Sequence, residues 1–171
     1  EYLHAKVAEL PFEPGLFTHV LIECRCIAMS DLAEVFTAAK QMLETGGQLI
    51  VNEPVLSPGT SLPKTIGRMV AETRLNEVLQ QRTAMEIGIE ITTAGFDMIH
   101  TSSEPEVIER LHQKMKQISM MLKMALRFSS FDPYSEEFPF KKKDLLKAFD
   151  EVKTALGDET FAWHSWLARP N

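Results

Sequence analysis

The sequence has 171 residues, of which 44% are hydrophobic and 25% are charged, and its formal net charge is −6. This length is typical of one domain, and the apolar fraction excludes a disordered chain. The acidic balance argues against a nucleic-acid binder, since the one dense basic run is Lys141-Lys142-Lys143. No apolar run reaches the ~18 residues of a membrane span. We therefore expect a cytoplasmic protein without nucleic-acid or membrane partners.

A helix is expected after the second strand of the chain. Asp31 and Glu34 have the spacing of a capping box, in which each side chain bonds the backbone of the other residue. Apolar side chains then recur every three or four residues, which places them on one helix face. Gly46 and Gly47 predict the end of this helix, because glycine adopts the left-handed conformation of a helix C-terminus.

The second half of the chain is richer in helix. Residues 64–94 are expected to be mostly helical with a break near Gly88, and a helix of roughly six turns starts near Ser103. A final helix ends at Gly157. This order predicts an α/β domain with a largely parallel sheet. The expected strands cover residues 2–7, 17–23, 48–52 (ending at Pro54), 96–101 and 161–168.

Four segments, in order and spacing, resemble class I S-adenosylmethionine-dependent methyltransferases. Residues 8–17, AELPFEPGLF, are similar to the family's link between its third and fourth strands. Residues 38–51 resemble the junction of helix D and the fifth strand, 93–96 the start of the sixth strand, and 163–170 the seventh. The resemblance implies a Rossmann-like methyltransferase fold, a mostly parallel sheet with helices on both faces and an antiparallel last strand.

Two hallmarks of that family are not found in this sequence. These are the Gly-rich loop D/E-x-G-x-G after the first strand and the acidic residue that ends the second strand. If the alignment is right, both would lie before Glu1, so the resemblance implies an N-terminally incomplete fold. We expect residues 1–171 to form a single methyltransferase-like domain, the C-terminal portion, with a helical insert at about 103–157.

The resemblance also implies where ligands bind, because open α/β sheets bind ligands at the carboxyl ends of their strands. It places S-adenosylmethionine beside five residues: Lys6, Val7, Ala8, Glu23 and Cys24. Lys6 occupies the position of the family's adenine-binding Asp, and an ammonium group cannot accept the hydrogen bond that this Asp accepts.

The acceptor side of the implied site would contain Arg25, Cys26, Asn52 and Glu53. No catalytic residue is identified. Two simpler interpretations stay open: Glu23 and Arg25 would form a solvated pair at a strand end, and Glu53 would only precede the proline that stops a strand. Cys24 and Cys26 have no companion Cys or His cluster, so we expect two reduced thiols and no metal.

The implied activity is methyl transfer from S-adenosylmethionine to a small-molecule acceptor. We also expect a homodimer, because an incomplete sheet would expose an edge strand at residues 2–7. The main alternative is a catalytically inactive methyltransferase-like domain that serves binding or assembly, which Lys6 and the missing Gly-rich loop favour. A third is an unrelated α/β domain with chance motif matches.

Overall fold

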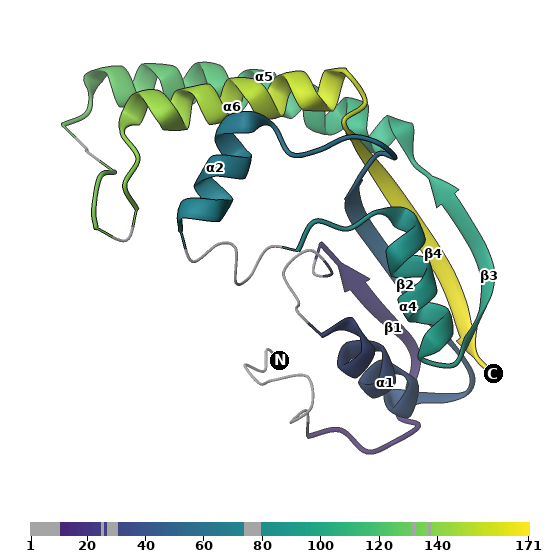
Figure 1. The fold of residues 1–171 in the computed structure, drawn as a ribbon. Helices are drawn as coiled ribbons and strands as arrows, with labels where there is room; N and C mark the ends of the chain where they lie inside the picture. Colours follow the sequence, from purple (N-terminus) through teal and green to yellow (C-terminus); the bar gives the residue numbers. More distant parts are fainter. Residues whose placement is uncertain (1–10, 25, 27–30, 74–79, 131–132, 137) are drawn as a thin grey trace.

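The structure is a computed structural model that describes residues 11–171 apart from 25, 27–30, 74–79, 131–132 and 137. Its strands form one sheet in the order β1-β2-β4-β3. β1 is parallel to β2, and β4 is antiparallel to both of its neighbours, β2 and β3 (Figure 1). The expected antiparallel last strand is therefore confirmed. The strands are β1 (Phe17–Glu23), β2 (Leu43–Leu56), β3 (Phe96–Ser103) and β4 (Phe161–Pro170). The strand expected at residues 2–7 lies outside the described residues.

Two helices pack against one face of the sheet (Figure 1). They are α1 (Leu32–Met42) and α4 (Ala84–Thr93). The buried core between them and the sheet includes Phe36 and Ile87 from the helices and Val51 and Trp166 from the strands. On the opposite face, Leu21, Ile50 and Leu167 pair across three strands, and Leu21 has an exposed fraction of 58%.

The first helix begins as expected and ends earlier. Asp31 accepts a hydrogen bond from the backbone N–H of Glu34 (2.9 Å), but α1 ends at Met42 and β2 begins at once. Gly46 and Gly47 instead lie at an irregularity in the pairing of β1 with β2. Gly46 has a φ of 82°, and a Cβ on Gly47 would lie 3.0 Å from the Glu44 carbonyl oxygen.

Pro54 does not stop the second strand, which continues to Leu56. β1 ends opposite Asn52, and the next backbone pairing described on that edge of β2 is the bridge between Leu56 and Thr83, so Pro54 lies between the two paired stretches. Proline is tolerated on a strand edge because its missing N–H removes no ladder hydrogen bond there. The expected break at Gly88 was also wrong, since this residue lies inside α4 beside the indole of Trp166.

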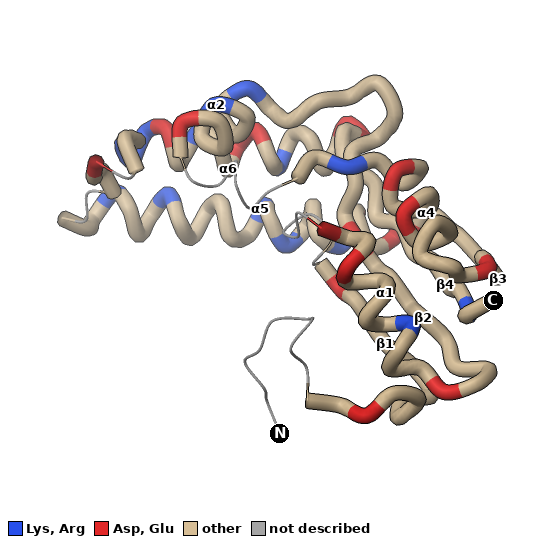
Figure 2. Tube along the Cα trace, turned by 60° about the horizontal axis from the view of Figure 1, so that its bottom comes forward, with Lys and Arg blue, Asp and Glu red and all other residues tan. Residues whose placement is uncertain are grey.

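The expected insert is a helical arm made of α5 (Pro105–Phe128) and α6 (Lys142–Gly157). The arm connects β3 to β4 and extends beyond the sheet in both views (Figures 1 and 2). At its base, the backbone N–H of Glu104 donates to the Trp163 carbonyl (2.8 Å) and that of Ser57 to the Thr160 carbonyl (3.0 Å). Among the described residues, no helix combines the length and apolarity needed to cross a bilayer.

Gly47 and Gly88 have different surroundings, so replacing each by alanine should change the stability of the protein in opposite directions. Gly47→Ala should destabilise the protein by about 1–3 kcal/mol, because its Cβ is crowded by two backbone oxygens, those of Glu44 and Thr18. Gly88→Ala should stabilise it by about 0.5–1 kcal/mol, since alanine favours helix and its Cβ would make an ordinary 3.6 Å contact with Trp166. Urea unfolding measures both. Equal effects of the two variants would contradict this packing.

Candidate functional site

A polar row crosses the sheet at the end where β1, β2 and β3 all terminate. Glu23 pairs with Asn52, Asn52 with Ser165, and Ser165 with Ser102. Residues that pair directly across neighbouring strands share a face, so the four side chains lie on the face opposite α1 and α4. Glu23 is exposed and the other three are half-buried. Sequence reasoning missed Ser102 and Ser165, because only the pairing of β3 and β4 places them in this row.

The chain turns sharply after β1. Cys24 has a φ of 53°, a conformation uncommon for residues other than glycine. Its backbone N–H donates to the Asn52 carbonyl (3.0 Å), so the turn remains attached to β2. Its side chain is exposed. Backbone strain of this kind is frequent at functional sites, where surrounding contacts hold it in place.

A fully buried carboxylate holds the segment after this turn. Glu53 follows Asn52 in β2 and therefore lies on the other face of the sheet, toward α1 and α4. Its Oε1 atom accepts a hydrogen bond from the backbone N–H of Cys26 (2.9 Å), and both residues have no exposed surface. A buried carboxylate requires hydrogen bonds to offset its lost hydration. Glu53 therefore fastens the chain after β1 to the end of β2.

Both thiols are disfavoured as thiolates. Burial, followed by the negative charge of Glu53 and a hydrogen bond to it, raises the pKa of the Cys26 thiol well above its ordinary value, and the positive charge of Arg82 opposes this only in part. Burial and the charges of Glu53 and Glu23 also raise the pKa of Cys24. Since the thiolate is the nucleophile and the metal ligand, neither role suits these residues at neutral pH. Among the described residues, no group of three His, Cys, Asp or Glu side chains could hold a metal ion.

The described members of the implied site cluster at one end of the sheet but on two faces. Glu23 and Asn52 belong to the polar row, whereas Cys26 and Glu53 are buried toward the helices. Four members, Lys6, Val7, Ala8 and Arg25, lie outside the described residues.

Only part of a cofactor site can be recognised in the described residues. The Glu23 carboxylate is exposed and could accept hydrogen bonds from S-adenosylmethionine, beside the turn at Cys24. The Gly-rich loop that would hold the rest of that molecule is not found in this sequence. The described residues therefore supply only one side of a cofactor site, the side formed by Glu23 and the turn at Cys24.

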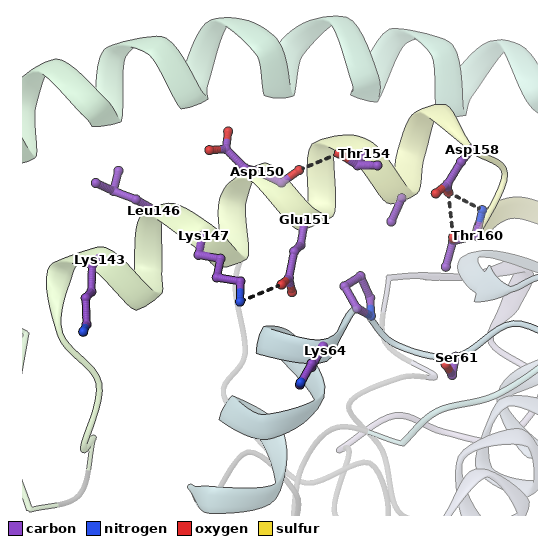
Figure 3. A pocket seen from close by; sticks show the side chains of 12 residues that line it. Ser61, Lys64, Lys143, Leu146, Lys147, Asp150, Glu151, Thr154, Asp158 and Thr160 are labelled. Carbon is purple, nitrogen blue, oxygen red and sulfur yellow. Dashed lines mark hydrogen bonds and ion pairs between the residues drawn. The ribbon is translucent and has the colours of Figure 1, made fainter.

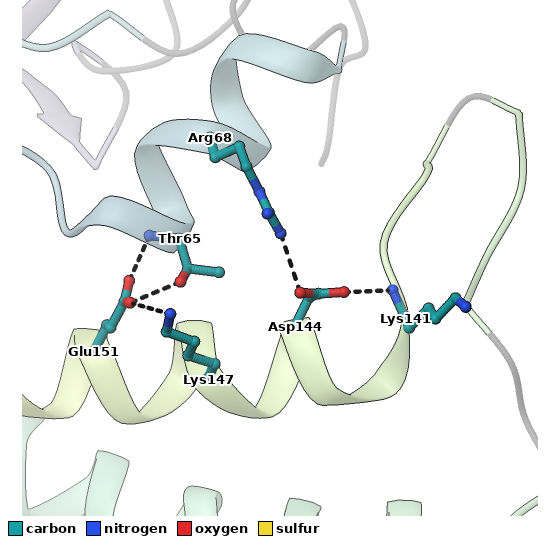
Figure 4. Close-up of polar contacts among 6 residues, drawn as sticks. All are labelled: Thr65, Arg68, Lys141, Asp144, Lys147 and Glu151. Atoms are coloured by element: carbon teal, nitrogen blue, oxygen red, sulfur yellow. Dashed lines mark hydrogen bonds and ion pairs between the residues drawn. The ribbon is translucent and has the colours of Figure 1, made fainter.

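The helical arm also determines where α2 (Lys64–Glu72) lies (Figure 4). The backbone N–H and the hydroxyl of Thr65 both donate to the carboxylate of Glu151 in α6, each at 2.6 Å. Arg68 forms an ion pair with Asp144 (3.0 Å) and lies over the ring of Phe140, with 5.2 Å from its guanidinium carbon to the ring centroid. Helix α2 is thus attached to α6 at two points.

The electrostatics of these contacts favour ionised carboxylates. Burial raises the pKa of Glu151, but the hydrogen bonds from Thr65 and the charge of Lys147 outweigh it and hold the pKa below its ordinary value. The backbone N–H of Lys141 and the guanidinium of Arg68 lower the pKa of Asp144. Both carboxylates are therefore charged at neutral pH.

A polar hollow lies beside these contacts, at the junction of α6 and α2. It has a volume of about 680 Å³, and it is lined by Lys64 at the start of α2 and by lysines and acids of α6 and its C-terminal end (Figure 3). Its acids already have partners within the protein: Glu151 bonds Thr65, Asp150 bonds Lys123 and Lys153, and Asp158 bonds Thr160. Lys and Arg are interspersed with Asp and Glu along the arm (Figure 2). We assign this hollow a structural role.

Comparisons with solved structures support this fold, although no protein-family model and no curated protein matches the chain. A provisionally assigned sarcosine dimethylglycine methyltransferase from Galdieria sulphuraria superposes with a TM-score of 0.68 at 13% identity, covering 96% of this chain and 57% of that one. Phosphoethanolamine N-methyltransferase 2 from Haemonchus contortus, in complex with S-adenosyl-L-methionine, gives 0.68 at 15% identity, covering 97% of this chain and 36% of that one. The chain has the Rossmann-like methyltransferase fold.

The same fold occurs in an enzyme named for a different reaction. The 4+2 cyclase SpnF superposes with a TM-score of 0.65 at 16% identity, covering 97% of this chain and 55% of that one. This chain therefore spans between about a third and somewhat more than half of the length of these structures.

The buried contact between Glu53 and Cys26 gives a second stability prediction. Glu53→Ala should lower the free energy of unfolding by about 1–3 kcal/mol, because it leaves the Cys26 N–H without its acceptor. Glu53→Gln retains an acceptor oxygen and should cost less. Urea unfolding of both variants measures this order.

Glu44→Ala is the control for this pair, since Glu44 is an exposed carboxylate at the start of β2. It should change the free energy of unfolding by less than about 0.5 kcal/mol. Similar losses in Glu53→Ala and Glu44→Ala would contradict the role given to Glu53.

Proposed function

We propose that this chain is part of an S-adenosylmethionine-dependent methyltransferase that acts on a small-molecule acceptor. The carrying observation is the sheet, in which an antiparallel β4 lies between β2 and β3 and the carboxyl ends of β1, β2 and β3 share one edge. Methyltransferases named for small substrates superpose over 96–97% of the chain, and one of them is in complex with S-adenosyl-L-methionine.

The proposed site has a cofactor side and an acceptor side. Glu23 and Cys24, with Lys6, Val7 and Ala8, are assigned to the cofactor side. S-adenosylmethionine would supply an electrophilic methyl group, and transfer depends on holding donor and acceptor in line. On the acceptor side, Asn52 and Arg25 are proposed to contact the substrate.

Cys26 and Glu53 receive a different role within the proposed acceptor side. Both are fully buried, and Glu53 bonds the backbone of Cys26. We assign them to positioning, because their contact fixes how the chain leaves β1. The exposed residues Glu23 and Cys24 lie at the start of that segment.

We also propose that residues 1–171 belong to one methyltransferase-like domain with the arm as its insert. The arm connects two adjacent antiparallel strands and leaves their pairing intact. The homodimer stays a prediction, because the edge expected to pair with a second copy, residues 2–7, lies outside the described residues.

A catalytically inactive binding or assembly domain is the second candidate. Lys6 favours it, because this residue cannot replace a hydrogen-bond acceptor for adenine. A shared fold does not fix the reaction, as the superposition with the cyclase SpnF illustrates.

Isothermal titration of the intact protein with S-adenosylhomocysteine tests the proposal. We expect saturable binding, and Glu23→Gln should weaken it by about tenfold, because the variant removes a charged acceptor at the end of β1. Glu44→Gln is the control, since it changes an exposed carboxylate at the opposite end of the sheet and should leave the affinity unchanged.

Absence of binding at millimolar S-adenosylhomocysteine would contradict the methyltransferase proposal and favour the inactive domain. Equal weakening by Glu23→Gln and Glu44→Gln would place the cofactor away from the carboxyl end of β1.

A further inference from the structure

A small apolar cavity lies beyond the polar row, beside the last three residues of β2, Pro54, Val55 and Leu56. Its volume is about 120 Å³. Val55 from β2, Val70 and Ile66 from α2, Leu62 from the preceding loop and Phe161 from β4 line it. Val55 and Val70 are buried, and the other three are half-buried. The cavity therefore offers hydrocarbon contacts on several sides.

The cavity adjoins the candidate site through Arg82. This residue lines the cavity, and its positive charge acts on the thiol of Cys26. Its carbonyl accepts a hydrogen bond from the backbone N–H of Leu56 (3.2 Å), at the last residue of β2. Arg82 is thus near both the cavity and the Cys26–Glu53 contact.

The arm holds one wall of the cavity in place. Ile66 and Val70 belong to α2, and the preceding residue Thr65 is bonded twice to Glu151 of α6. Thr65 is itself buried, and the two bonds to Glu151 are partly buried. The cavity wall is therefore fixed by contacts within the protein before a ligand arrives.

The volume restricts what the cavity can hold. An engineered apolar cavity of ~150 Å³ binds benzene, so one of about 120 Å³ accommodates roughly five carbon atoms. A purine, with two fused rings, is too large. The cavity therefore does not suit the adenine of the cofactor, and the five hydrocarbon side chains that line it offer no hydrogen bond to a charged group.

We propose that this cavity seats a short hydrocarbon group, about five carbons long, on the molecule that receives the methyl group. The inference rests on the proposed function, since it deepens the acceptor side of that site. Gln80 and Gln81 lie at the cavity beside Arg82, and their amides can bond the polar part of the same molecule. The acceptor class is thus a small amphiphile with a compact apolar end.

A series of linear 1-alkanols from ethanol to octanol tests the cavity. Binding to the intact protein is followed by the NMR shifts of the methyl groups of Ile66 and Val70. The dissociation constant should fall about fourfold per added methylene and level off beyond about five carbons. A dissociation constant that does not depend on chain length would overturn the proposal.

Two variants and one control locate the binding. Val70→Phe fills the cavity and should weaken pentanol binding more than tenfold, with the remaining Ile66 methyl groups as reporter. Leu62→Ala enlarges the cavity and should move the levelling point to alkanols longer by about two carbons. Met121→Phe is the control, because Met121 is exposed on α5 and its replacement should change nothing. Loss of pentanol binding in the control, or an unmoved levelling point in Leu62→Ala, would also overturn the proposal.

Titration with S-adenosylhomocysteine on the same samples separates this inference from the proposed function. Val70→Phe should bind S-adenosylhomocysteine as the unsubstituted protein does, and its loss would assign the cavity to the cofactor. If the unsubstituted protein binds S-adenosylhomocysteine but shows no chain-length dependence, only this inference fails. If it fails to bind S-adenosylhomocysteine, the proposed function fails, and with it the assignment to a methyl acceptor.

Discussion

The pairing of β4 between β2 and β3 is the contact on which the rest of the structure depends. Within the described part of the chain, β3 joins the sheet only through β4, which pairs with eight residues of β2 and also runs antiparallel along β3. Trp166 and Ala168 of β4 lie in the main core beneath α1 and α4. Residues 161–170 must therefore be in place before β3 can join the sheet, and non-local pairing of this kind is intrinsically slow to form.

The same pairing explains why the arm begins and ends at the edge of the sheet where we propose that ligands bind. β3 and β4 are adjacent and antiparallel, so the arm is an insertion into the connection of a hairpin, and both of its ends emerge where β1, β2 and β3 terminate. A hairpin of helices can be long without disturbing the sheet because it leaves and returns at one point. Here it returns with Glu151, which fixes α2 through Thr65 and so shapes the apolar cavity. The segment from β3 through the arm to β4 therefore connects the sheet to the cavity.

The order of elements could be predicted from the sequence, and the placement of side chains only in part. The strand at residues 17–23 and the cap at Asp31 followed from local patterns and are confirmed. Pro54 and the Gly46–Gly47 pair were misread, because the gap in pairing at Pro54 and the irregular pairing of β2 with β1 are tertiary features. Asn52 and Glu53 were both expected toward the acceptor, yet consecutive strand residues point to opposite faces. Alternation alone could have separated them, whereas Ser102 and Ser165 required the pairing of the last two strands.

Glu53 connects the two faces of the sheet. It is buried on the face that α1 and α4 cover, and it bonds the backbone just after Glu23 and Cys24, of which Glu23 belongs to the polar row on the opposite face. The central claim is that this edge holds a cofactor and a methyl acceptor side by side. A crystal structure of the intact protein with S-adenosylhomocysteine tests it most directly. The ligand should lie at the carboxyl end of β1, with a polar atom within hydrogen-bond distance, roughly 3.5 Å, of Glu23 or Cys24. A ligand bound elsewhere, with this edge filled by protein side chains, would contradict the claim.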